Sequence, residues 1–195
     1  GTAVTTAPSV KVTDAQGNAV SGVSVTFATG TGSGSLASSS AVTTDSAGIS
    51  SSPAWTLSTT AGANTLTATS GTLTGSPVSF TATGVAGVAA KLAITTQPVG
   101  GTGGSVLTSQ PLVAIRDQYG NLVSTDSSTQ VTVAIHSGTG GSLGFISCGS
   151  LTRTAASGVV TFSGVTLAGT VGQNYELRFT SSPTLTSVDS QNVTI

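Results

Sequence analysis

The sequence predicts an all-β fold made of sandwiches of short strands. Apolar and polar residues alternate with a period of two in short runs, as at residues 23–27, 131–135 and 175–179. This is the period of a strand with one buried and one solvated face. Clusters of Gly, Asn and Asp separate the runs, and helical periodicity is almost absent. Many short strands with frequent turns are typical of a sandwich or a barrel.

The composition points away from several classes of partner. Only 6 % of the 195 residues are charged and the formal net charge is -1, whereas about a quarter of an ordinary globular domain is charged. We expect no nucleic-acid partner, because no basic patch could neutralise phosphates. Hydrophobic residues make up 37 % but aromatics only 4 %, so the core is expected to consist mainly of Val, Leu, Ile and Ala. No apolar run has the length of a membrane helix, so we expect no membrane insertion in this segment.

An internal repeat predicts two domains rather than one. The pattern Asp-x-x-Gly-Asn at residues 14–18 recurs 103 residues later, at residues 117–121. Further landmarks follow in the same order, namely residues 23–27 with 131–135, Gly48 with Gly158, and Asn64 with Asn174. Each copy is then near the roughly 100 residues of a typical sandwich domain. We therefore expect one domain at residues 1–86 and a second at residues 87–195.

Four segments carry a resemblance to a known family, residues 14–27, 43–48, 55–69 and 91–98. At the first three, the chain resembles the invasin/intimin-type bacterial immunoglobulin-like repeats of surface adhesins. At the fourth, it resembles a related repeat of long bacterial surface proteins. The resemblance covers nearly the whole chain and implies two tandem immunoglobulin-like β-sandwiches, extracellular and at the bacterial cell surface. It implies neighbouring repeats or subunits as partners, and it carries over no catalytic residue and no particular host or surface ligand.

The two copies differ at their beginnings. About a dozen residues before Gly104 are expected to form the first strand of the second copy. Gly1 matches Gly104, so the first copy is expected to lack its first strand. The edge that this strand would cover is expected to include Val4, Val10 and Val12.

Two explanations of the open edge remain. In the first, a cut in the chain removes the strand or leaves the edge open, and the chain is a stalk or adhesin repeat. This is the simpler explanation, because open edges are usually managed locally. In the second, another subunit donates the strand, since an unpaired edge is a template for β-augmentation, and the chain is a subunit of an extracellular filament.

The two Asp-x-x-Gly-Asn motifs are expected to be turns. An Asp at the start of such a turn accepts hydrogen bonds from backbone N–H groups. We assign this turn-capping role to Asp14 and Asp117, with Asn18 and Asn121 completing the motifs. Calcium is the alternative at these carboxylates, but it requires about six to eight oxygen ligands, and no Asp-x-Asp-x-Asp cluster occurs. We therefore favour the turns and expect no cofactor.

The sequence contains no visible catalytic constellation, so we expect no enzyme activity. His136 is the only histidine and directly follows a strand, and no Gly-x-Ser-x-Gly elbow presents a serine nucleophile. Cys148 has neither a neighbouring base nor a helix N-terminus to activate its thiol. A carbohydrate-binding module, the third possibility, would need exposed aromatic residues, whereas Trp55 and Tyr175 are expected to pack in the cores. The remaining carboxylates are scattered, at Asp45, Asp126, Glu176 and Asp189.

Overall fold

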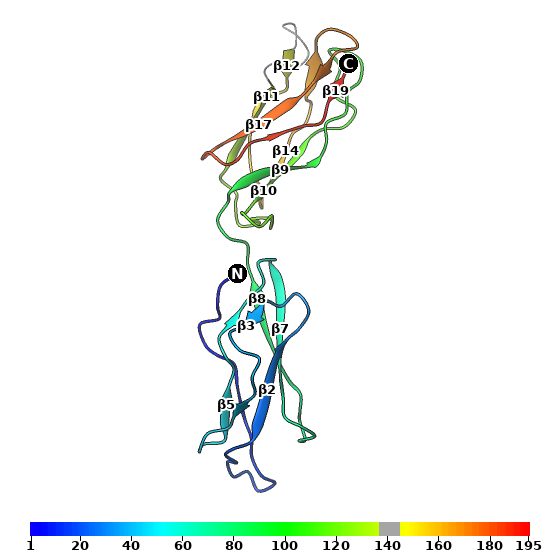
Figure 1. Ribbon diagram of the computed structural model, residues 1–195. Helices are drawn as coiled ribbons and strands as arrows, with labels where there is room; N and C mark the ends of the chain where they lie inside the picture. The colour runs from blue at the N-terminus through cyan, green and yellow to red at the C-terminus, as the bar shows by residue number, and fades with distance from the viewer. Residues whose placement is uncertain (137–144) are drawn as a thin grey trace. The chain divides into compact units, whose positions relative to one another are not determined.

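The computed structural model describes residues 1–136 and 145–195 and is all-β, with no helix in these two ranges. The chain divides into two compact units, Gly1–Val85 (unit 1) and Ala86–Ile195 (unit 2). The division lies one residue from the boundary expected between residues 86 and 87. The glycine-rich loop that the sequence places at residues 138–144 lies outside the described residues. The all-β, immunoglobulin-like sandwich fold is confirmed (Figure 1).

Unit 2 has two facing sheets. One contains, in order, β14 (Val159–Thr161), β10 (Leu112–Arg116) and β9 (Lys91–Thr96). The other contains β13 (Thr152–Thr154), β11 (Gln130–Ile135), β17 (Leu177–Ser182) and β18 (Val188–Asp189). Short pairs complete the unit: β12 (Phe145–Ser147) with β15 (Thr166–Ala168), and β16 (Asn174–Tyr175) with β19 (Val193–Thr194). The strand pairs are antiparallel throughout.

The core of unit 2 follows from the alternation along its strands. On β11, Val131 and Val133 are fully buried, and the residues between and beside them are at least partly exposed. Phe179 of β17 is paired with Val133, and its ring packs on Phe162 with centroids 5.5 Å apart. From the other sheet, β10 contributes a row of buried aliphatic residues, which includes Ile115.

Unit 1 repeats this plan with fewer strands in one sheet. The larger sheet contains β4 (Val42–Thr43), β2 (Ser24–Thr29), β7 (Gly62–Thr69) and β8 (Val78–Gly84). Against it lie two strand pairs, β1 (Ser9–Lys11) with β5 (Ile49–Ser51) and β3 (Ser35–Leu36) with β6 (Trp55–Thr56). The buried core consists of Val25, Phe27, Trp55, Leu66 and Ala68. The indole N–H of Trp55 is satisfied inside this core, because it donates to the carbonyl oxygen of Ser33 at 2.9 Å.

The first residues of the chain belong to unit 1 as well. Ala3 forms an antiparallel bridge with Thr56 of β6. The N–H of Val4 donates to the carbonyl oxygen of Trp55 at 2.9 Å, and that of Leu57 donates to Thr2 at 3.0 Å. The side chain of Val4 packs against the core. The segment before β1 is therefore held against β6.

The separate cores predict that the two units respond separately to core mutations. Phe179→Ala should lower the free energy of unfolding of unit 2 by about 3–5 kcal/mol, because it leaves a cavity at a fully buried position. Trp55, the only tryptophan, reports on unit 1 through its fluorescence. In urea titrations, Phe179→Ala should leave the Trp55 transition in place, whereas the control Leu66→Ala should shift it to lower urea. A shift of the Trp55 transition by Phe179→Ala would contradict this prediction.

Candidate functional site

The strand edge of unit 1 differs from the matching edge of unit 2. By the repeat, β1 corresponds to β10 and β5 to β14. In unit 2, β10 is paired on both edges, with β14 on one side and β9 on the other. In unit 1, β1 is paired with β5, and no second strand pairs with it among the described residues. Within residues 1–85, no strand therefore takes the place that β9 has in unit 2.

The open edge of β1 presents backbone hydrogen-bonding groups. The N–H of Val12 donates to the carbonyl oxygen of Gly48 at 2.8 Å, on the β5 side. Along an antiparallel strand, the backbone N–H and C=O groups of successive residues point to opposite edges. The backbone groups of Val10 therefore point toward β5, like those of Val12. Those of Ser9 and Lys11 point toward the open edge. In unit 2, the residue matching Lys11 is Ala114, which is paired with Ala93 of β9.

A groove follows this open edge. It has a volume of about 430 Å³ and lies between β1 and the segment of residues 70–76 that connects β7 to β8. Its apolar lining comes from both sheets: Val10, Val12, Val25, Ala68, Leu73 and Val78. Lys11, Asp14 and several small polar residues complete the lining. The groove is thus a largely uncharged channel that opens onto the unit 1 core.

Burial at the matching positions shows what the missing strand would cover. In unit 2, Val113 and Ile115 are 0 % exposed beneath β9. Their counterparts in unit 1, Val10 and Val12, are only partly buried. Of the three edge residues expected from the sequence, the structure brings Val10 and Val12 together in the groove. It places Val4 elsewhere, beside β6.

The turn after β1 is built around Asp14. Its Oδ1 accepts hydrogen bonds from the N–H groups of Gln16 at 2.9 Å and Asn18 at 2.8 Å. Its Oδ2 accepts from the amide of Asn18 at 3.0 Å. This side-chain bond from Asn18, with the backbone bonds, lowers the pKa of Asp14. Gly17 has φ of 89°, a left-handed conformation that favours glycine.

The matching turn in unit 2 has one more partner. Asp117 accepts from the N–H groups of Tyr119 and Asn121, each at 2.9 Å, and from the Asn121 amide at 2.8 Å. In addition, its Oδ2 accepts from the N–H of Gly87 at 2.9 Å, which fastens the start of unit 2 to this turn. The Asn121 side chain is the largest cause of the lowered pKa of Asp117, which is about 2.

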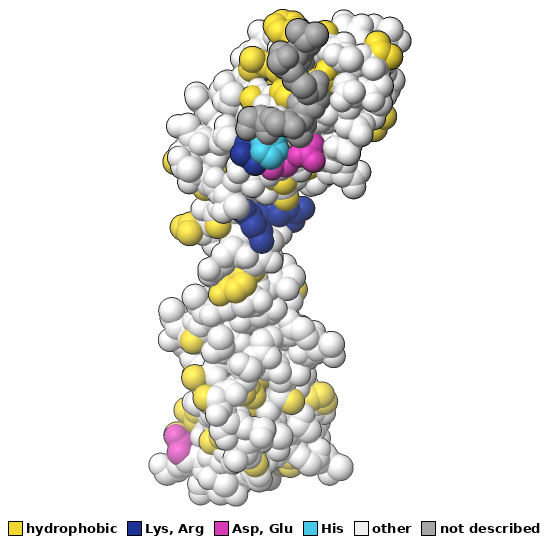
Figure 2. Space-filling model, turned by 45° about the horizontal axis from the view of Figure 1, so that its top comes forward, with side chains coloured by type: hydrophobic (Ala, Val, Ile, Leu, Met, Phe, Trp, Pro, Cys, Tyr) yellow, Lys and Arg dark blue, Asp and Glu magenta, His cyan; other side chains and the backbone are white. Residues whose placement is uncertain are grey.

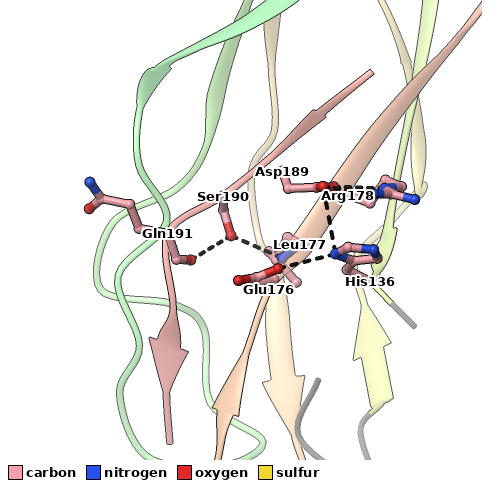
Figure 3. Close-up of polar contacts among 7 residues, drawn as sticks. All are labelled: His136, Glu176, Leu177, Arg178, Asp189, Ser190 and Gln191. Atoms are coloured by element: carbon pink, nitrogen blue, oxygen red, sulfur yellow. Dashed lines mark hydrogen bonds and ion pairs between the residues drawn. The ribbon is translucent and has the colours of Figure 1, made fainter. Parts of the chain in front are cut away.

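A second polar cluster, in unit 2, was not expected from the sequence (Figure 3). Arg178 donates to both carboxylate oxygens of Asp189 at 2.7 Å, since β17 and β18 pair these two residues directly. His136 Nδ1 lies 3.1 Å from Glu176 Oε2 and 3.6 Å from Asp189 Oδ2. The bond from Arg178 is the largest cause of the lowered pKa of Asp189. Figure 2 shows the histidine and acidic side chains together, with Lys and Arg side chains close by, on a surface that is elsewhere largely uncharged.

The cluster joins residues on or beside three neighbouring strands through close polar contacts. Both carboxylates have partners, and their closeness depends on strand register, which the spacing of residues 136, 176 and 189 along the chain does not reveal. Among the residues that the structure describes, no three His, Cys, Asp or Glu side chains gather as metal ligands. Within the same residues, no helix is long and apolar enough to cross a membrane.

The two aromatic residues considered for sugar binding lie in the cores. Trp55 is 1 % exposed and Tyr175 is 0 % exposed. The hydroxyl of Tyr175 is also engaged, because it accepts a hydrogen bond from the N–H of Thr170 at 2.8 Å. Neither ring can stack on a sugar in this conformation.

Comparisons with known proteins give a likeness in structure only. No family model and no curated protein match the chain. Similar solved structures include the adhesin InvE of Yersinia pseudotuberculosis, at 18 % identity over 96 % of this chain and 53 % of that one, with a TM-score of 0.40. They also include invasin, a bacterial integrin-binding protein (21 %, 95 % and 34 %, TM-score 0.37), and the β-glucuronidase of Parabacteroides merdae (15 %, 88 % and 21 %, TM-score 0.39). The chain thus spans between about a fifth and about half of the length of these structures.

The Asp117 turn predicts an acid-sensitive step in unit 2. Its folded pKa of about 2 lies below the ordinary value of 3.8, so the stability that it contributes is complete above about pH 4 and is lost as the pH falls toward 2. Asp117→Asn should remove part of this acid dependence. It should also destabilise unit 2 at pH 7, since an amide has one acceptor oxygen in place of two.

Urea midpoints of unit 2 between pH 2 and pH 7, followed by tyrosine fluorescence, would measure the effect. Asp126 and Asp189 also have lowered pKa values, so the dependence should shrink rather than vanish. Asp14→Asn, in unit 1, is the matched control and should leave the unit 2 profile unchanged. Identical profiles for Asp117→Asn and the unmutated chain would contradict the prediction.

Proposed function

We propose that this chain is a structural extracellular module, a pair of stalk or adhesin repeats within a bacterial cell-surface protein. The observation that carries the proposal is that each unit encloses its own core of buried strand residues. The contribution of the chain is therefore the folded structure itself. The resemblance of both copies to immunoglobulin-like repeats of bacterial surface proteins supports the setting. Modules of this kind place another part of a protein at a distance from the cell.

The start of unit 2 supports this role. The segment 85–90 connects β8 of unit 1 to β9 of unit 2. Gly87 donates to Asp117, Ala90 donates to the carbonyl oxygen of Arg116 at 2.9 Å, and Ala86 and Ala89 pack against the unit 2 core. The chain therefore follows a fixed path into unit 2, as a structural repeat requires.

The surface chemistry supports an extracellular, tethered setting. With 6 % charged residues, the chain has little electrostatic repulsion to keep free molecules apart in a concentrated solution. Its strands instead expose many Thr and Ser residues, as at alternate positions of β2. A protein anchored in an array has less need of such repulsion than a free one.

The groove in unit 1 favours a second candidate function, a subunit of an extracellular filament. In that case a strand donated by another subunit would complete unit 1 along β1. The two candidate functions predict different oligomeric states for the isolated chain. Sedimentation velocity at rising concentration should give a monomer throughout for a repeat, whereas long assemblies visible by electron microscopy would support the filament.

A replacement experiment tests the main proposal. The chain is placed between an outer-membrane anchor and a terminal epitope, and the epitope is measured with antibody on intact cells. Exchanging both units for unrelated immunoglobulin-like sandwiches of equal length should leave the signal unchanged, and Glu176→Gln should do so as well. The core mutation Phe179→Asp should reduce the signal, because a buried unpaired carboxylate unfolds unit 2. Loss of display after the exchange of sandwiches would contradict a purely structural role.

A further inference from the structure

Unit 2 shows how the edge of this sandwich is covered. β9 pairs antiparallel with β10, with Leu92 opposite Ile115 and Ile94 opposite Val113. Leu92 is 4 % exposed, and Ile94 packs against the same core. On its other side, the N–H of Leu92 donates to the carbonyl oxygen of Thr186 at 2.9 Å, in the connection between β17 and β18. β9 therefore lies between β10 and this connection.

The groove of unit 1 occupies the matching place. It lies between β1 and the connection of residues 70–76, which joins β7 to β8 as the Thr186 connection joins β17 to β18. In the register of unit 2, a strand in this groove would place one side chain opposite Val12 and another opposite Val10. Both of these side chains would contact the apolar lining of the groove. Leu73 and Val78 of this lining are 45 % and 41 % exposed.

We propose that the groove of unit 1 binds an extended peptide segment, antiparallel to β1, with apolar side chains at two alternate positions. Backbone groups of Ser9 and Lys11 pair with this segment, and its apolar side chains cover Val10 and Val12. The occupant comes from outside residues 1–195, because the strands that the structure describes, β9 among them, are already paired within their own units.

The groove also indicates which residues of the bound segment determine its affinity and in which direction the segment runs. Lys11 and Asp14 are the charged residues of its lining, and both are exposed, so the apolar positions of the segment determine affinity. In unit 2, Oδ2 of Asp117 holds the N–H of Gly87, four residues before β9 begins. Asp14 is placed to accept the matching N–H of the bound segment. The inference does not depend on the stalk or adhesin role, so its failure would leave that role intact.

The test uses a synthetic peptide of residues 86–98, which contains β9, and the full 195-residue chain. Binding of the labelled peptide is measured by fluorescence anisotropy, and the site is mapped by amide chemical shifts. Saturable binding is expected, with shifts confined to β1, Asp14 and residues 70–78. A control peptide with Leu92→Thr and Ile94→Thr should bind at least about tenfold more weakly, because two buried aliphatic side chains are lost.

Two variants of the chain locate the peptide. Lys11→Pro removes the edge N–H while the β5 side of the strand keeps its bonds, and proline is tolerated at such an edge position. Leu73→Lys places a long charged side chain in the groove at an exposed loop residue and leaves the core intact. Each should lower affinity at least about tenfold, with the Trp55 urea transition as the check that unit 1 remains folded.

Five results would overturn the inference, and four of them concern the peptide. These are the absence of binding, equal affinity for the two peptides, unchanged affinity in both variants, and chemical-shift changes at β10 instead of β1. Self-association of the chain through β1 without peptide would overturn it as well, since the occupant would then be a second copy.

Discussion

Burial of the apolar faces of the central strands between two sheets is the constraint on which both units depend. With so few charged and aromatic residues, aliphatic side chains at alternate strand positions supply most of the driving force for folding. Such a core is complete only when strands cover it to its edges. In unit 2, β9 completes the cover over Val113 and Ile115. In unit 1, the same positions are partly open, and the groove is the physical result.

The turn chemistry is shared by the two copies, but it has different consequences in each. Asp14 and Asp117 both accept the N–H groups of their own turns. Only Asp117 also accepts an N–H from the chain entering its unit, at Gly87. The carboxylate thus serves two segments in unit 2, whereas Asp14 lies at the end of the groove in unit 1. The Asp-x-x-Gly-Asn turn therefore lies next to the place of the edge strand in both units, and in unit 2 it also binds the segment that leads into that strand.

The sequence alone was enough to predict the all-β sandwich fold. The strand period indicated the fold class, and the offset between the two Asp-x-x-Gly-Asn motifs led to the expectation of an open edge that includes Val10 and Val12, which line the groove. It did not place Val4 correctly beside β6, because the pairing of a short irregular segment depends on tertiary contacts and not on alternation. Nor did it reveal the far wall of the groove, where Leu73 lies in a loop without periodicity.

The polar cluster of unit 2 was missed for a related reason. The spacing between His136, Glu176 and Asp189 has no regular period, and the three meet only through the register of β11, β17 and β18. Register is set by the buried faces of the strands, so surface pairs such as Arg178 and Asp189 follow from the core rather than from any local motif.

The bond between Gly87 and Asp117 has a mechanical consequence. If the chain is pulled from its N-terminal side, tension reaches unit 2 through residue 86 and acts first on this charge-assisted bond. It then acts on the bond from Ala90 and on the ladder between β9 and β10. Unit 1 meets the same pull with the bonds that join residues 2–4 to Trp55 and Leu57. Under load, the two sandwiches would therefore begin to yield at different kinds of contact, and unit 1 would release its first residues without disturbing the pairing of β1.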